Sequence, residues 1–99
     1  MKILSKDDYD NISINKLSGY FKDTLGNISW FQNGKLHRDN KPAVELDAGA
    51  QIWYLHGKLH RIDGPAIIAT NGDKFWYQNN KLHRIDGPAV EFSNGNIQF

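Results

Sequence analysis

The sequence has no cysteine, one methionine, three prolines and no long run of apolar residues. Without cysteine, the chain has neither a disulfide framework nor a thiolate metal site. Only Ile3 and Leu4 stand between Lys2 and Lys6, which is too short for the apolar core of a signal peptide. No segment approaches the ~20 apolar residues of a membrane-spanning helix. These absences predict a cytoplasmic protein.

The chain also lacks an excess of charge of either sign. Twelve Lys and Arg residues are set against eleven Asp and Glu, which gives a net charge of +1 over 99 residues. This balance excludes an acidic mimic of DNA and argues against nucleic acid or a membrane surface as partner. Hydrophobic residues make up 39% of the chain, as in a folded domain. The length allows one domain with a thin core.

The dominant feature that is present is an internal repeat of 23 residues. Trp30, Trp53, Trp76 and Phe99 are spaced by this period, and three copies occupy residues 30–52, 53–75 and 76–99. The strictest shared element is Lys-Leu-His-Arg at 35–38, 58–61 and 81–84, followed by Pro-Ala at 42–43, 65–66 and 88–89. The same register makes residues 19–29 an eroded half repeat. We therefore expect a repeat array over 19–99.

Residues 1–18 form a separate N-terminal segment without a repeat signature. Ser5 and Asp8 could cap a short helix. Ile12 and Ile14 alternate with polar residues, as in a strand. We expect a cap or a strand here.

Turn residues divide each repeat into short β segments. Thr70-Asn71-Gly72 and Ser93-Asn94-Gly95 lie between apolar or aromatic runs, which is a strong hairpin signal that calls for positive φ at both central residues. A second set of turns follows the aromatic pairs at Asn33-Gly34, His56-Gly57 and Asn79-Asn80. The sequence predicts an all-β, antiparallel meander of tandem hairpins with two or three strands per repeat. The hairpins should form an elongated, twisted sheet in which each copy touches its neighbours.

Alternation along a strand assigns the side chains to faces. Stacked copies would make one ladder of Trp30, Trp53, Trp76 and Phe99 and another of Phe31, Tyr54 and Tyr77. Leu and Arg of each Lys-Leu-His-Arg box should share one face, and Lys and His the other. We expect one aromatic ladder to form the core and the other to cover the opposite face or to meet a partner.

The repeat resembles the MORN repeat. The resemblance rests on the 23-residue period, on an aromatic residue three positions before a turn glycine, and on the spacing Gly34 to His37 and Gly57 to His60. It is most like a MORN-like variant, W-[YF]-x-N-G-K-x-H-R-x-D-G-P-A, of short phage and bacterial proteins. It implies a β-hairpin array that acts as a scaffold, binding or dimerisation module. The chain departs from MORN repeats by carrying Arg after each His, and Asp39-Asn40-Lys41 departs from the Ile-Asp-Gly of the other copies.

Three histidines and two aspartates are candidates for chemistry, and their regular spacing argues against it. Equivalent residues of stacked hairpins lie ~9–10 Å apart, too far to share one metal ion. Catalysis needs one unique constellation, whereas these groups recur along the sheet. We therefore expect structural roles, with no metal, no cofactor and no enzymatic activity, for the aromatic, imidazole, guanidinium and carboxylate groups of the repeat: Trp30, Trp53, Trp76, His37, His60, His83, Arg38, Arg61, Arg84, Asp63 and Asp86.

A partner surface is expected where side chains face outward or where the repeat breaks its own pattern. The residues that meet this description are Phe31, Tyr54, Tyr77, Lys35, Lys58, Lys81, His56, Asp39 and Phe99. The predicted function is a non-enzymatic protein-binding module, and the resemblance extends this to a phage-encoded inhibitor of a host defence protein, such as an anti-CRISPR, in the host cytoplasm. The alternative is sequestration of a nucleotide-like ligand by the aromatic and Arg ladders. The strand edge at Phe99 predicts a homodimer or strand pairing with a partner.

Overall fold

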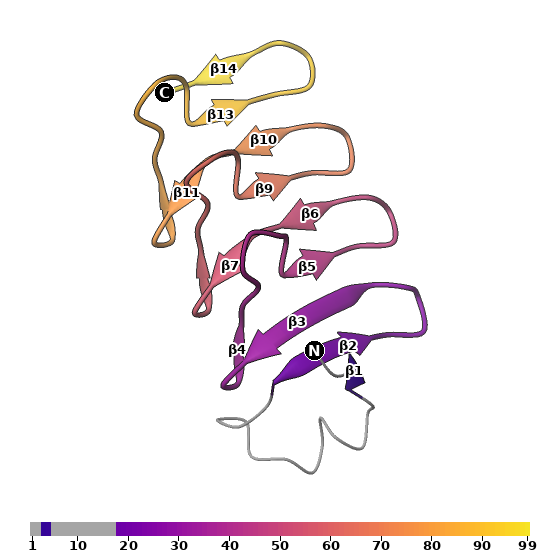
Figure 1. The fold of residues 1–99 in the computed structure, drawn as a ribbon. Helices are drawn as coiled ribbons and strands as arrows, with labels where there is room; N and C mark the ends of the chain where they lie inside the picture. Colours follow the sequence, from indigo (N-terminus) through magenta and orange to yellow (C-terminus); the bar gives the residue numbers. More distant parts are fainter. Residues whose placement is uncertain (1–2, 5–17) are drawn as a thin grey trace.

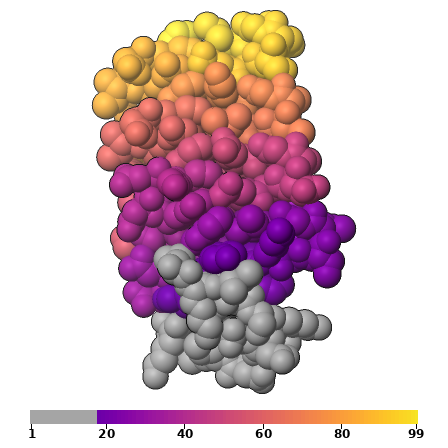
Figure 2. Space-filling view, turned by 45° about the vertical axis from the view of Figure 1, so that its right-hand side comes forward, coloured from indigo at the N-terminus to yellow at the C-terminus, as the bar shows by residue number. Residues whose placement is uncertain are grey.

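The computed structural model describes residues 3–4 and 18–99 and shows an all-β meander (Figure 1). This part of the chain contains no helix, and its strands follow one another as an open antiparallel array. The stacked repeats appear in Figure 2 as successive bands along one axis of the molecule. The principal extents are 44 × 25 × 17 Å, as expected for an elongated array. The predictions for Ser5, Asp8, Ile12 and Ile14 fall outside the described residues.

Each full repeat holds four short strands, so the prediction of two or three was wrong. The strands are β3 (Ile28–Gln32), β4 (Lys35–Leu36), β5 (Val44–Glu45) and β6 (Gln51–Ile52) in the first copy, β7 (Tyr54–Leu55), β8 (Lys58–Leu59), β9 (Ile67–Ile68) and β10 (Lys74–Phe75) in the second, and β11 (Tyr77–Gln78), β12 (Lys81–Leu82), β13 (Val90–Glu91) and β14 (Ile97–Gln98) in the third. Two hairpins fit into 23 residues because each strand is only a few residues long. The chain begins with β1 (Ile3–Leu4) and β2 (Gly19–Lys22).

The two hairpins of a repeat belong to two columns of the array (Figure 1). The main sheet has the order β1-β2-β3-β5-β6-β9-β10-β13-β14, and each repeat adds two strands to it. The second column consists of the small hairpins β3–β4, β7–β8 and β11–β12. All pairs are antiparallel except β1 with β2. Trp53 and Trp76 lie between two strands, at the corner where the backbone leaves the main sheet for a small hairpin.

The two sets of turns have different backbone geometries. In the small hairpins both central residues have positive φ, as at Asn33 and Gly34 (51° and 78°), which is a type I′ turn. In the turns of the main sheet only the glycine has a positive φ, as at Gly72 (96°). The Gly72 N–H donates to the Ala69 carbonyl, and the Ala69 N–H donates to the Asp73 carbonyl. This is a type I turn followed by a bulge glycine. The expectation of positive φ at both Asn and Gly was therefore wrong for the main-sheet turns.

The buried core consists of small residues. Besides Pro42, the buried apolar side chains in the described part of the chain are Ala43, Ala50, Ala66, Ala89 and Val90. The tryptophans and the Phe31, Tyr54 and Tyr77 ladder are only half-buried, and Phe99 is exposed. The expectation that an aromatic ladder forms the core was therefore wrong. The reason is the thinness of the array, in which a large ring at a corner keeps one edge in solvent.

The Lys-Leu-His-Arg box does not form one continuous strand. Only Lys and Leu lie in β4, β8 and β12, and the chain leaves the hairpin at the histidine. The predicted sharing of faces within the box was therefore wrong beyond its second residue. His37 instead donates its backbone N–H to the Trp30 carbonyl, which begins the corner.

Candidate functional site

Each corner is built on a tryptophan covered by the arginine of its own repeat. The guanidinium carbon lies 3.7 Å from the ring centroid for Arg38 on Trp30, and 3.9 Å for Arg61 on Trp53. Arg84 repeats the 3.9 Å contact on Trp76. These are cation–π distances, and they also shield the rings from solvent. The guanidinium groups of Arg38, Arg61 and Arg84 are therefore engaged by the tryptophan rings.

The same guanidinium closes the corner loop that follows it. Nη1 of Arg38, Arg61 and Arg84 donates to the carbonyl of the proline four residues later, at 3.2, 3.1 and 3.1 Å. The proline has a fixed φ and no N–H, so it suits a tight loop in which only its carbonyl needs a partner. A Cβ on Gly64 would lie 2.7 Å from Arg61 Cζ, so a larger residue there would require the guanidinium to shift.

Carboxylates complete the shell around each arginine and give the corner its outward charge. Arg61 Nε donates to Asp63 Oδ1 at 3.0 Å, and Arg84 Nε to Asp86 Oδ1 at 3.3 Å. The Arg61 side chain is 23% exposed, whereas that of Asp63 is 88% exposed. Arg84 and Asp86 show the same contrast. The outward charge at these two corners is therefore mainly that of the aspartates.

The histidines connect one repeat to the next. His37 Nδ1 accepts the backbone N–H of His56 at 2.9 Å, and His60 Nδ1 accepts that of Asn79 at 3.1 Å. His37 is buried and donates through Nε2 to Asp39 at 3.0 Å, while its ring lies 4.5 Å from that of His56. His83 is exposed. Over residues 3–4 and 18–99, no group of three His, Asp or Glu side chains is arranged to hold a metal ion.

Side-chain oxygens also join successive turns of the main sheet. Asn27 Oδ1 accepts the Asp47 N–H at 2.8 Å, and Asp73 Oδ1 accepts the Ser93 N–H at 2.7 Å. The Ser93 N–H lowers the pKa of Asp73. The backbone N–H of Asn27 is the main cause of a lowered pKa at Asp23. Both pKa shifts arise because backbone N–H groups donate hydrogen bonds to the ionised carboxylate. These two aspartates therefore stabilise turns of the sheet.

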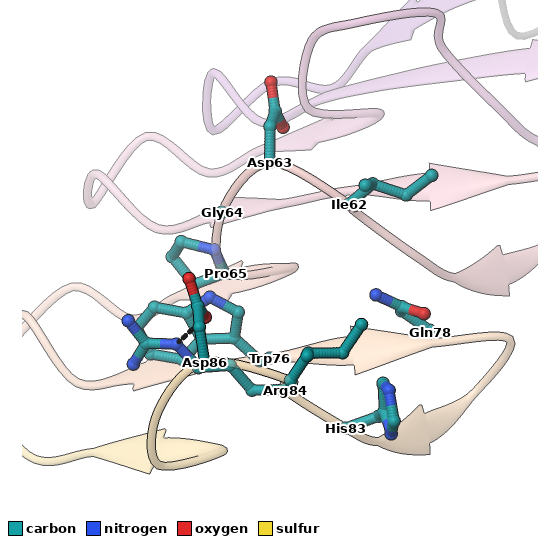
Figure 3. Close-up of a pocket in the computed structure, with 10 residues that line it drawn as sticks. Ile62, Asp63, Gly64, Pro65, Trp76, Gln78, His83, Arg84 and Asp86 are labelled. Atoms are coloured by element: carbon teal, nitrogen blue, oxygen red, sulfur yellow. Dashed lines mark hydrogen bonds and ion pairs between the residues drawn. The ribbon is translucent and has the colours of Figure 1, made fainter.

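Two grooves lie at corresponding places between successive corners, and their linings correspond in part. The larger, about 580 Å³, runs between the loop of Ile62 to Pro65 and the hairpin of the third repeat, where Trp76, Gln78 and His83 line it (Figure 3). Pro65 lies beside the Trp76–Arg84 pair in this view. The smaller groove, about 290 Å³, lies one repeat earlier. Its lining residues Trp53, His60, Arg61, Ile62 and Asp63 are the 23-residue equivalents of Trp76, His83, Arg84, Ile85 and Asp86.

Two large apolar side chains stand at the rims of these grooves. Ile62 is 79% exposed and Ile85 is 87% exposed. Burying either side chain would remove apolar surface from water, which is favourable. No other residue in the described part of the fold covers them. Sequence reasoning missed both residues. The available signal was an isoleucine inside a polar turn, at a position that the first repeat fills with Asp39.

The partner residues that the sequence predicted lie mostly in the second column and are not gathered at one site. Phe31, Tyr54 and Tyr77 lie in β3, β7 and β11, opposite Leu36, Leu59 and Leu82. Lys35, Lys58 and Lys81 begin β4, β8 and β12 and are exposed. His56 occupies an exposed turn with φ of 52°, and Asp39 lies at the first corner. Of these, only Tyr54 lines either of the two grooves described above.

Comparisons with family models, curated proteins and solved structures find no match for the chain. Among the described residues there is no helix long and apolar enough to cross a bilayer.

Proposed function

We propose that the chain is a non-enzymatic repeat module that binds a partner protein through its row of corners. The observation that carries this proposal is the pair Ile62 and Ile85, two exposed apolar side chains in the same place on successive repeats. A stabilising role within the described fold does not account for them, since Asp39 fills the equivalent position. Association with a partner would bury them.

The corner scaffold suits such a role because it is rigid. Each loop is held by a ring stack, a carbonyl bond and at least one ion pair, and binding therefore costs little ordering of the backbone. The resemblance to short phage MORN-like proteins extends the proposal to an inhibitor that occupies the surface of a host defence protein. Sequestration of a nucleotide is less well supported, because the arginines are engaged with tryptophan, proline carbonyls and carboxylates.

The test is a comparative capture experiment. The immobilised chain and an Ile62→Asp/Ile85→Asp variant, which carries at both corners the residue type of Asp39, are exposed to lysate of the natural host, and bound proteins are quantified by mass spectrometry. A Leu25→Asp variant is the matched control, because Leu25 is an equally exposed apolar residue on the β2–β3 turn. The proposal expects a protein retained by the wild type and the control but lost by the corner variant. Equal capture by all three chains would contradict it.

A further inference from the structure

The two grooves form a row with a fixed repeat distance. Each repeat adds two strands to the main sheet, and strands lie 4.7–4.9 Å apart, so equivalent corners are separated by ~9.5 Å. A ligand that contacts both grooves in the same way needs the same period. We propose that the row binds a proline-rich segment of a partner protein in the polyproline II conformation, with a basic side chain at every third residue. This inference rests on the proposed function and names its ligand.

Among regular backbones, polyproline II best matches this distance. It has three residues per turn and rises 3.1 Å per residue, so every third side chain returns to the same face after ~9.3 Å. A β-strand also advances ~10 Å in three residues, but its side chains alternate, and residues three apart face opposite sides. One turn of an α-helix rises only 5.4 Å and two turns rise ~10.8 Å, so neither matches as closely as ~9.3 Å. A polyproline II segment can therefore present the same group to Ile62 and Ile85 in succession.

The chemistry of the groove fits proline rings. Trp76 lines the groove beside the Arg84 guanidinium that lies over its ring, and Pro65 and the exposed Ile62 add an aliphatic lining. Aromatic and aliphatic grooves are the kind of surface on which proline-rich segments dock. Polyproline II has no internal hydrogen bonds, so its carbonyls need donors. Gln78 and His83 supply side-chain N–H groups at the groove wall, and neither makes a side-chain hydrogen bond within the described part of the chain.

The negative charge at the surface of the corners favours a basic residue at every third position of the ligand. Asp63 and Asp86 stand one per repeat, each with an exposed carboxylate. Each arginine is turned onto its own tryptophan and is mostly shielded. A Lys or Arg at every third position would follow the carboxylates along the row. Because the segment is already extended before binding, it loses little conformational entropy.

The inference is tested by isothermal titration of the full chain with a peptide of four Pro-Pro-Lys units. This length spans about 37 Å in polyproline II and reaches along the corner row. Two control peptides separate the contribution of charge from that of backbone conformation. Four Pro-Pro-Glu units keep the polyproline II backbone and reverse the charge. Four Gly-Ser-Lys units keep the charge and remove the preference for polyproline II. We expect the Pro-Pro-Lys peptide to bind at least about ten-fold more tightly than either control.

Two variants locate the binding. Ile62→Ser/Ile85→Ser and Asp63→Asn/Asp86→Asn should each weaken binding of the Pro-Pro-Lys peptide by about ten-fold or more, while Leu25→Ser leaves it unchanged. Equal affinity for the Gly-Ser-Lys peptide, or binding that survives both corner variants, would overturn the inference. Absence of binding to any of the peptides would also overturn it. If the comparative capture experiment still finds a corner-dependent partner, the proposed function stands with a ligand of another shape; if it does not, both proposals fail.

Discussion

The first repeat and the two that follow it share a scaffold but differ at the corner. Arg38 lies on Trp30 and bonds the Pro42 carbonyl, as Arg61 and Arg84 do on Trp53 and Trp76. The first corner, however, reads Asp39-Asn40-Lys41, and Asn40 adopts a φ of 61°. The comparison teaches that the ring, the guanidinium and the proline carbonyl close the corner with either Asp-Asn-Lys or Ile-Asp-Gly at its tip.

The carboxylate that pairs with the arginine also differs from one repeat to the next. Arg38 pairs with Glu45, Arg61 with Asp63, and Arg84 with both Asp86 and Glu91. In the second repeat Ile68 takes the place of the glutamate. One carboxylate at either position therefore satisfies the scaffold, and the other position is free to change.

The largest expected effect is at the feature that all copies share. Trp53→Ala and Trp30→Ala should each lower the free energy of unfolding by about 3 kcal/mol, the low end for loss of a large aromatic, because the rings are half-buried and stacked on arginine. Urea denaturation followed by circular dichroism measures both. A Trp30 variant as stable as the wild type would show that the first repeat does not use the shared scaffold.

Next in size is the contrast between the first histidine and the last. His37→Ala removes a buried ring and leaves the His56 N–H without its acceptor, which should cost about 2 kcal/mol. His83→Ala removes an exposed ring and should change the free energy of unfolding by less than about 0.5 kcal/mol. Denaturation of the two variants side by side gives the difference. Equal costs would contradict the role of His37 in joining two repeats.

A smaller effect separates the tips of the corners. Gly64→Ala places a Cβ against Arg61 and should displace the guanidinium from Trp53, at a cost of about 1 kcal/mol. Lys41, at the equivalent position of the first repeat, already has a Cβ, so Lys41→Ala should be nearly neutral. The measurement is the denaturation midpoint of each variant. A neutral Gly64→Ala would mean that the arginine shifts without losing its contacts.

The smallest effect concerns the turns of the main sheet and depends on pH. The pKa of Asp73 is lowered by the Ser93 N–H, so its carboxylate stabilises the fold above its ordinary pKa of 3.8, and this contribution is lost as the pH falls through the lowered value. Asp73→Ala should therefore be less stable than the wild type at neutral pH. Asp73→Asn keeps an oxygen acceptor, as Asn27 does, and should remove this part of the acid dependence. Denaturation midpoints between about pH 2 and pH 7 test both variants.

The sequence predicts the architecture well because its signals are local. The exact period, the small-hairpin turns at Asn33, His56 and Asn79, and the absence of any long stretch without a breaker lead directly to an antiparallel meander. The number of strands was less accessible, since a two-residue strand such as β8 has no alternation to detect. The identity of the core was also missed, because its alanines show no pattern until the thickness of the array is known.

The candidate site was harder to predict than the fold. The arginines, aspartates and tryptophans were expected to have structural roles, but their pairing depends on how the corner loop folds back over the ring. Ile62 and Ile85 gave only a weak signal because apolar residues at the surface are common. Their meaning comes from exposure and from their position beside a groove, and both are properties of the folded chain.

The tolerance of the corner loop has a consequence for how such a chain can change. Each copy closes its own loop with its own tryptophan, arginine and proline, so the tip of one loop can be altered without disturbing the others. Selection can therefore vary the tips of the three loops independently on one frame. Under the proposed function, mutation at Asp39, Ile62 and Ile85 would generate a combinatorial set of binding specificities at little cost in folding.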